Sequence, residues 1–133
     1  KRDIFIMLNF KDIQMETIFT SSQNKNSLVR LKAITKIKYW NVLCRLAFCI
    51  SIKDDALPRN VDEAADGVEM TWETFSGKYG PVYIGLLIRN LRKNNIEITK
   101  SNLNKFLRAH INRGIYLVFN HRNRSINQFL NIN

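Results

Sequence analysis

The sequence contains few of the residues from which catalytic and metal sites are built. It has only two cysteines and two histidines in 133 residues. The cysteines lie five positions apart and the histidines eleven, and neither spacing matches a known zinc site. There is no GxSxG, HExxH or CxxC motif and no glycine-rich phosphate loop. The acidic stretch DEAADG also lacks the alternating ligands of a calcium loop. We therefore expect a protein that is not an enzyme and that needs no metal or cofactor.

Long apolar runs are also missing. The longest candidate, Val42–Ile52, contains Arg45 and is about half as long as the ~20 residues of a membrane-spanning helix. On a helix, Cys44 and Cys49 would point to different faces, so we expect no disulfide between them. Together with the lack of a signal-peptide pattern, these features predict a cytoplasmic protein that does not bind a membrane.

Acidic residues are scarce outside one segment. The chain has 21 Lys and Arg against 11 Asp and Glu, and a pI near 10.0. Seven of the acids lie between Asp54 and Glu73, where the only basic residue is Arg59, so this segment has a net charge of −6. The remainder has 20 basic and four acidic residues, net +16. A surface of this charge predicts a polyanionic partner, and nucleic acid is the first class to consider.

The apolar pattern predicts a mainly α fold in a single small domain spanning residues 1–133, with 1–14 as a loose N-terminal extension. A short N-terminal strand, Gln14–Thr20, is followed by about four helices. We expect these helices to run from Ser21 or Ser22 to Lys36, from an Asn41 cap to Ile52, from Pro81 to Asn95, and from a Thr99 cap to Arg113, with Gly114 as the stop. Residues 68–73 alternate between apolar and polar, as in a strand or an extended arm. The succession of strand and helices resembles the start of a ribbon-helix-helix module, which pairs two strands across a dimer.

One histidine lies on the last predicted helix. Counted from Leu103, His110 falls on the apolar stripe of that helix. A buried imidazole that donates a hydrogen bond to a carbonyl is the favoured interpretation, and a functional histidine is the alternative. Arg113 beside Gly114 fits either a ligand role or the capping of a helix end.

Basic residues supply the candidate DNA contacts. Lys25, Lys32 and Lys36 share one face of the first predicted helix, away from Leu28 and Leu31. Further basic residues lie in the following turn, on the last helix and near the C-terminus. The complete set of candidates is Lys25, Lys32, Lys36, Lys38, Arg108, Arg113, Arg122 and Arg124. Neutralising phosphates with such side chains releases condensed counterions, which favours binding without distinguishing DNA from RNA.

Several stretches of the sequence resemble one protein family. These stretches are METIFTSS, LVRLKAITKIKYWNVLCRLAFCISI, TFSGKYGPVYIGLLI and LRAHINRGI. They are similar to the DndE family of the bacterial DNA phosphorothioation system, and the similarity covers roughly residues 15 to 130. The residues before Met15 have no recognisable counterpart. The resemblance implies a small protein without known catalytic chemistry of its own, which supplies DNA contact and assembly of the modification complex. Its system replaces a non-bridging phosphate oxygen with sulfur, using a cysteine desulfurase, an adenylating sulfur-transfer protein and an ATPase.

Three functions follow from these observations. The leading hypothesis is a DNA-binding subunit that contacts the backbone of double-stranded DNA, preferring nicked or distorted duplex, and works with the sulfur-transfer protein and the ATPase. The second is a ribbon-helix-helix regulator, although its strand is poor in base-reading residues. The third is a protein-docking adaptor that uses the acidic segment. An exposed strand edge and a helix as apolar as Val42–Ile52 also predict a homo-oligomer, for which a tetramer is our working assumption.

Overall fold

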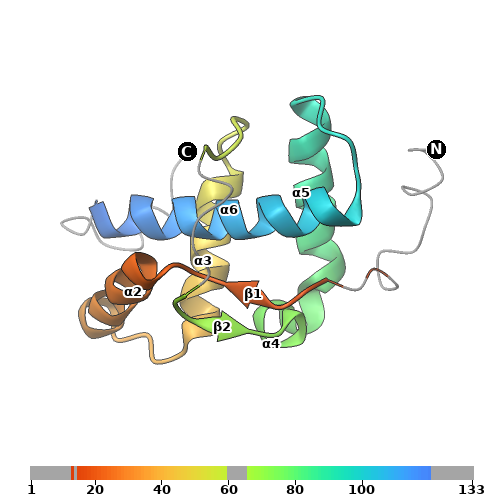
Figure 1. Cartoon of the computed structure of the whole chain (residues 1–133). Helices are drawn as coiled ribbons and strands as arrows, with labels where there is room; N and C mark the ends of the chain where they lie inside the picture. Colours follow the sequence, from red (N-terminus) through yellow and green to blue (C-terminus); the bar gives the residue numbers. More distant parts are fainter. Residues whose placement is uncertain (1–12, 14, 60–65, 121–133) are drawn as a thin grey trace.

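The computed structural model describes residues 13, 15–59 and 66–120. These ranges are mainly helical with one small antiparallel sheet, which confirms the predicted fold class (Figure 1). The helices are α2 (Ser22–Thr35), α3 (Trp40–Ile52), α4 (Trp72–Ser76), α5 (Gly80–Lys93) and α6 (Lys100–Asn120), and a 3-10 turn (Gly77–Tyr79) lies between α4 and α5. The strands are β1 (Ile18–Phe19) and β2 (Glu69–Met70). None of the helices in these ranges combines the length and the apolar character needed to cross a bilayer.

The starts of the helices mostly follow the local signals in the sequence. The Ser21 hydroxyl accepts a hydrogen bond from the Asn24 N–H at 3.1 Å and caps α2. Pro81 lies in the first turn of α5, and Thr99 Oγ1 accepts from the Asn102 N–H at 3.0 Å at the start of α6. The prediction of Asn41 as a cap is wrong, because α3 begins at Trp40 and the Asn41 amide donates to the Thr74 carbonyl instead.

The sheet is shorter than the sequence pattern predicts. β1 pairs with β2 of the same chain, with Ile18 opposite Met70, so its pairing differs from that of a ribbon-helix-helix strand, whose partner belongs to a second chain. The alternation over residues 68–73 also does not continue as a strand. Thr71 Oγ1 accepts from the Thr74 N–H at 3.1 Å and starts helix α4, which turns Trp72 into the core.

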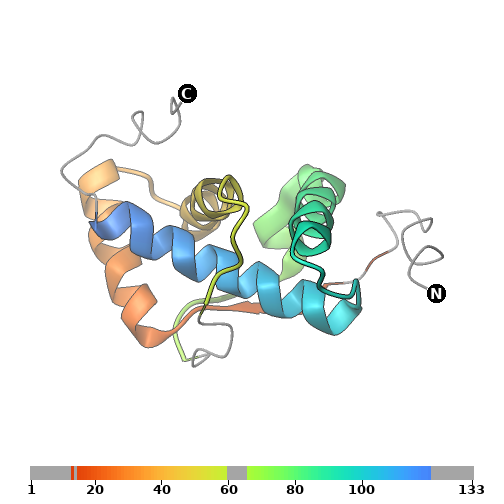
Figure 2. The ribbon, with the colours of Figure 1, turned by 90° about the horizontal axis from the view of Figure 1, so that it is seen from above.

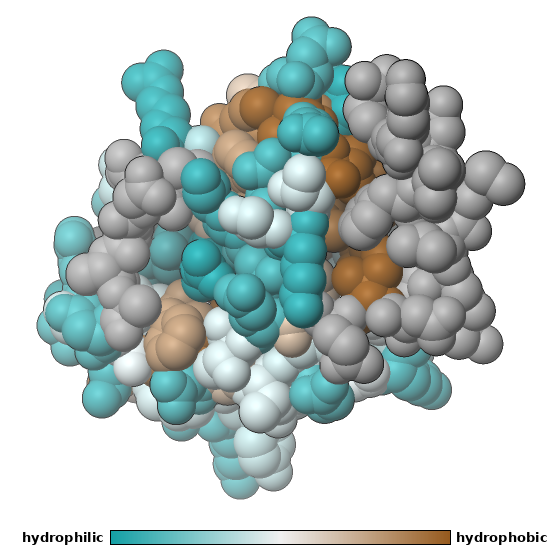
Figure 3. All heavy atoms as spheres, turned by 45° about the vertical axis from the view of Figure 1, so that its right-hand side comes forward, coloured by the Kyte–Doolittle hydropathy of each residue, from teal (hydrophilic) through white to brown (hydrophobic). Residues whose placement is uncertain are grey.

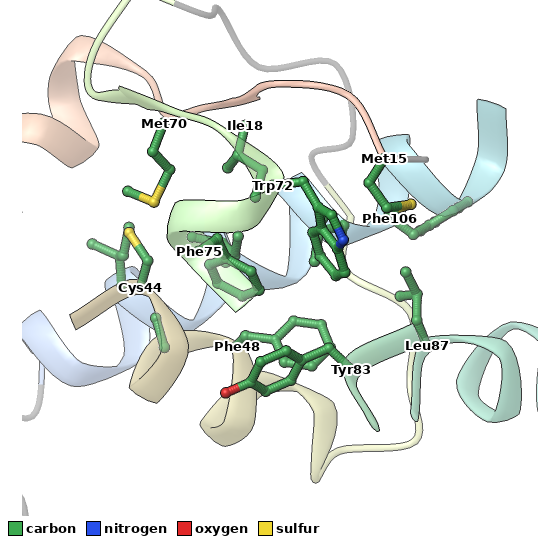
Figure 4. Close-up of a cluster of buried hydrophobic side chains, with 14 of the residues drawn as sticks. Met15, Ile18, Cys44, Phe48, Met70, Trp72, Phe75, Tyr83, Leu87 and Phe106 are labelled. Carbon is green, nitrogen blue, oxygen red and sulfur yellow. The ribbon is translucent and has the colours of Figure 1, made fainter. Parts of the chain in front are cut away.

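Aromatic side chains from several elements fill the centre of the core. The Phe48 ring on α3 makes edge-to-face contacts with Phe75 and Tyr83, with centroids 6.1 and 5.6 Å apart. Figure 4 shows Phe75 between Ile18 and Met70 of the sheet side and the rings of Phe48 and Tyr83. One hydrophobic core therefore joins the sheet to α3, α4, α5 and α6.

Helix α6 runs across α3 and α5 (Figures 1 and 2). The prediction that Gly114 ends this helix is wrong, because α6 continues to Asn120. Gly114 is instead the point of closest approach to α3, where a Cβ atom would lie 1.8 Å from the Ala47 carbonyl oxygen. The absent side chain therefore permits the helix crossing and does not stop the helix.

Candidate nucleic-acid interface

Helix α2 separates an apolar face from a charged one. Leu28 and Leu31 are buried, 0% and 3% exposed, whereas Lys25 is exposed to solvent. Lys32 is half-buried because its amino group lies over the Trp40 ring, with Nζ 4.1 Å from the ring centroid. The predicted division between the leucines and Lys25 is thus present in the structure, but Lys32 packs against an aromatic ring.

The end of α2 changes the position of the third predicted lysine. The helix ends at Thr35, and Lys36 adopts a left-handed conformation with φ 66° while its N–H donates to the Lys32 carbonyl at 3.0 Å. Lys36 therefore lies outside the helix, and the prediction that it continues the helical lysine stripe is wrong. Its left-handed turn directs the chain toward Lys38 and α3.

This turn brings three of the predicted DNA-contacting residues together. A hollow of about 660 Å³ lies where α2 meets α3, and Lys32, Lys36 and Lys38 line it together with Val29, Ile37 and Trp40. We call these six residues the α2–α3 corner. Lys25 is on α2 but does not line the hollow. The corner therefore combines an apolar floor with three ammonium groups.

The lysines of the α2–α3 corner have no acidic counter-ion in the described part of the chain. Only two ion pairs occur within those ranges, Lys93 with Asp55 at 3.0 Å and Arg108 with Glu16 at 3.9 Å. Within those ranges, no acidic side chain neutralises the positive charge of the corner.

The two candidate arginines on α6 are already engaged within the protein. Arg108 makes the ion pair with Glu16. Arg113 donates from Nε to the Ser51 hydroxyl at 2.8 Å and from Nη2 to the Ser51 carbonyl at 2.8 Å, and so caps the end of α3. Arg122 and Arg124 lie outside the described residues.

The buried histidine belongs to a chain of directed hydrogen bonds. The Ser51 hydroxyl accepts from the Arg113 guanidinium and lies 2.8 Å from His110 Nδ1. In the neutral imidazole, which burial favours, the ring carries its proton on Nε2, so Nδ1 accepts the Ser51 proton. His110 Nε2–H then donates to Asn90 Oδ1 at 2.8 Å, and Asn90 Nδ2 donates to the Asp55 carbonyl at 3.0 Å. The predicted buried imidazole that donates to a carbonyl is confirmed, and the carbonyl is that of a side-chain amide.

Burial keeps the imidazole of His110 neutral. Burial, and after it the nearby Arg113 charge, lower the pKa of His110 to about 3, while Asp54 acts in the opposite direction. The ring also packs edge-on against Phe48, with centroids 5.9 Å apart. His110 therefore joins α3, α5 and α6 as an uncharged part of the core.

The thiols are in apolar surroundings. Cys44 and Cys49 are both free, and burial raises the pKa of Cys44 to about 12. Burial also raises the pKa of the half-buried Cys49. Both groups are therefore protonated near neutral pH, the form that is least nucleophilic. The described residues also contain no group of three or more His, Cys, Asp and Glu side chains that could hold a metal ion.

Sequence reasoning missed the apolar members of the corner. Trp40 and Ile37 lie in the stretch TKIKYW, which was recognised only as a turn. Two lysines and two aromatics within five residues were the available signal, since cationic and aromatic side chains often occur together at nucleic-acid surfaces.

The fold and this surface define a small helical protein with a buried polar centre and three lysines at one corner. A family model described as "DNA sulphur modification protein DndE" matches residues 17–125. The chain belongs to the DndE family.

Solved structures have the same fold. One is the crystal structure of DndE from Escherichia coli B7A, described as involved in DNA phosphorothioation modification, which is 23% identical in sequence with a TM-score of 0.64. The match covers 79% of this chain and 97% of the Escherichia coli chain. Another is the crystal structure of a DndE G21/24K mutant, described as involved in DNA phosphorothioation, which is 20% identical in sequence with a TM-score of 0.57. The match covers 79% of this chain and 98% of the mutant chain. No match was found among the curated proteins.

Proposed function

We propose that this protein is a non-catalytic DNA-binding subunit of the bacterial DNA phosphorothioation system. In this role it contacts the backbone of double-stranded DNA, including nicked or distorted duplex, through a basic surface, and helps to assemble the modification complex. Membership of the DndE family supports a role in that system. Two parts of the proposal go beyond family membership. This protein contacts DNA, and other proteins of the system carry out the sulfur chemistry.

The observation that carries the DNA contact is the positive charge gathered at the α2–α3 corner and at Lys25. Lys25, Lys36 and Lys38 are exposed, and within the described residues none of them forms an ion pair. A net charge of +10 adds long-range attraction to a polyanion. Ammonium groups in such positions can replace the counterions of DNA phosphates, which is the main source of sequence-independent affinity.

The remaining candidates extend this surface. We propose Arg108, Arg113, Arg122 and Arg124 as secondary contacts. For Arg113, only the terminal nitrogen Nη1 has no partner among the described residues, so it would reach DNA with part of its guanidinium. The α2–α3 corner therefore remains the primary contact in this proposal.

Self-association is part of the proposal. Three large apolar side chains are well exposed in this region: Val29 of the corner at 50%, and Ile34 and Tyr39 beside it at 51% and 67%. The face toward α5 also carries apolar residues beside hydrophilic ones (Figure 3), and Val82 on α5 is 56% exposed. Surfaces of this kind support association. We propose a homo-oligomer, with a tetramer as the working assumption, that binds the sulfur-transfer protein and the ATPase in the cytoplasm.

Binding to random-sequence duplex tests this function. We expect the full chain to bind intact and nicked duplexes of any sequence at ~100 mM salt. The logarithm of the binding constant should fall linearly with the logarithm of the salt concentration, with a slope of about −0.9 for each phosphate contact. A single preferred sequence would favour the ribbon-helix-helix regulator. Absence of DNA binding, together with binding to the sulfur-transfer protein or the ATPase, would favour the docking adaptor.

A further inference from the structure

A second hollow lies on another part of the molecule, between the first turn of α2, the second half of α6 and the segment that follows α3. Its volume is about 520 Å³, and Arg113, Arg59, Tyr116, Asn112, Pro58 and Asp54 are among the residues that line it. It shares no residue with the α2–α3 corner. Sites for small ligands commonly have volumes of roughly 300–1,000 Å³.

One wall of this hollow carries the half-buried guanidinium of Arg113. Arg113 forms no ion pair within the described residues, and its Nη1 has no hydrogen-bond partner there. The nearby Asp54 carboxylate accepts from the Ala56 N–H at 2.9 Å. Arg59, which is exposed, adds a second guanidinium to the same hollow. Among the described residues that line the hollow there are two guanidiniums and one carboxylate, a balance that favours an anion. Guanidiniums bind phosphate oxygens in pairs of parallel hydrogen bonds.

The remaining walls fit a flat group with polar edges. Tyr116 follows Arg113 by three positions on α6 and is 62% exposed. The buried Asn112 accepts from Asn24 Nδ2 at 2.7 Å through its Oδ1, which leaves its own amide donors without a partner in the described part of the chain. Pro58 adds a buried apolar side chain. An aromatic face, an amide donor and two guanidiniums therefore occur at one place.

We propose that this hollow binds a nucleotide. Its phosphate would contact Arg113 and Arg59, its base would stack on Tyr116, and the Asn112 amide would donate to an acceptor on the base edge. The same chemistry can come from a free mononucleotide or from one nucleotide of a DNA strand. The site goes beyond the proposed backbone contact, because it does not need the lysines of the α2–α3 corner.

Calorimetric titration of the full chain tests the site, with deoxyadenosine 5′-monophosphate as the probe and deoxyadenosine and inorganic phosphate as comparisons. We expect the mononucleotide to bind once per chain and more tightly than either comparison. Tyr116→Ala removes the stacking contact with the base, and Arg59→Ala removes a phosphate contact. Each substitution should therefore weaken binding of the mononucleotide by about tenfold or more. The matched controls Tyr79→Ala and Arg89→Ala, exposed residues that do not line the hollow, should bind as the unaltered chain does. Melting curves establish that each variant is folded.

A second titration with a short single DNA strand identifies the source of the nucleotide. If the mononucleotide does not bind but Tyr116→Ala and Arg59→Ala both weaken binding of the strand, the ligand is a nucleotide within DNA. The proposal is wrong if neither substitution changes the binding of either probe, or if inorganic phosphate binds as tightly as the mononucleotide. Weakened strand binding only in lysine variants of the α2–α3 corner would overturn this site and leave the proposed function intact.

Discussion

Gly114 on α6 lies directly against the backbone of Ala47 on α3. A Cβ atom at Gly114 would be 1.8 Å from the Ala47 carbonyl oxygen and 2.3 Å from its carbon. No side-chain rotation can relieve these contacts, because both atoms belong to the backbone of a helix. The distance between α3 and α6 therefore depends on the absence of a side chain at this position.

Gly114→Ala should consequently destabilise the fold, even though alanine is the better helix former. We expect the free energy of unfolding to fall by about 2–4 kcal/mol, since the two helices must move apart or bend. Urea denaturation measures the change. Gly80→Ala is the matched control: its Cβ would meet the Trp72 ring at 3.3 Å, and a side chain can shift slightly, so the loss should be clearly smaller. Equal stability of Gly114→Ala and the unaltered chain would contradict this helix crossing.

His110→Ala should lower the free energy of unfolding by about 1–3 kcal/mol, because packing and two hydrogen bonds are lost together. Combined with Asn90→Ala in a double-mutant cycle, it should show a coupling energy above about 0.5 kcal/mol, since the two side chains are in contact. The DNA affinity of the folded protein should stay the same. Retained stability with lost DNA binding would instead make His110 a functional residue.

Acid should weaken the fold through the same histidine. Its pKa is lowered from 6.5 in the unfolded chain to about 3 in the folded one, so the unfolded state takes up the proton first as the pH falls. The stability that neutral His110 contributes is thus complete above pH 6.5 and is lost toward pH 3. The difference in unfolding free energy between the unaltered chain and His110→Ala should shrink by about 2 kcal/mol between pH 7 and pH 5. A difference that does not change with pH would show that the imidazole has the same pKa in the folded and the unfolded state.

Local signals in the sequence were sufficient for most of the helix starts. Ser21, Pro81 and Thr99 act on their own first turns, so their roles could be predicted without knowledge of the tertiary structure. Gly114 could not be assigned in this way. Glycine can serve as a left-handed stop or as a point of close approach, and only the position of Ala47 decides between them. The alternation of Trp72 with polar neighbours likewise predicts a strand or an extended arm, whereas the Thr71 cap starts a helix.

The candidate interface could be predicted only in part. The lysines were identifiable from charge and helical spacing, and so was the buried position of His110. The hollow at the α2–α3 corner depends on the left-handed turn at Lys36 and on the contact between Lys32 and Trp40. A positive φ at a lysine is uncommon and leaves no mark in the sequence. The grouping of Lys32, Lys36 and Lys38 around one apolar floor therefore became visible only in the structure.

The most direct test of the proposed DNA-binding role is duplex binding by two charge-reversal variants of equal net charge. The first changes Lys25, Lys36 and Lys38 to Glu, three exposed residues, and spares Lys32 because its amino group packs on Trp40. The second changes Lys78, Arg89 and Arg92 to Glu, which are also exposed and lie outside the α2–α3 corner.

Affinity for random duplex is measured at ~100 mM salt, with the helix content and the oligomer mass of both variants confirmed. We predict that the first variant no longer binds, because attractive phosphate contacts become repulsive, while the second keeps most of its affinity. Unchanged binding by the first variant, or equal loss in both, would contradict a DNA contact centred on the α2–α3 corner.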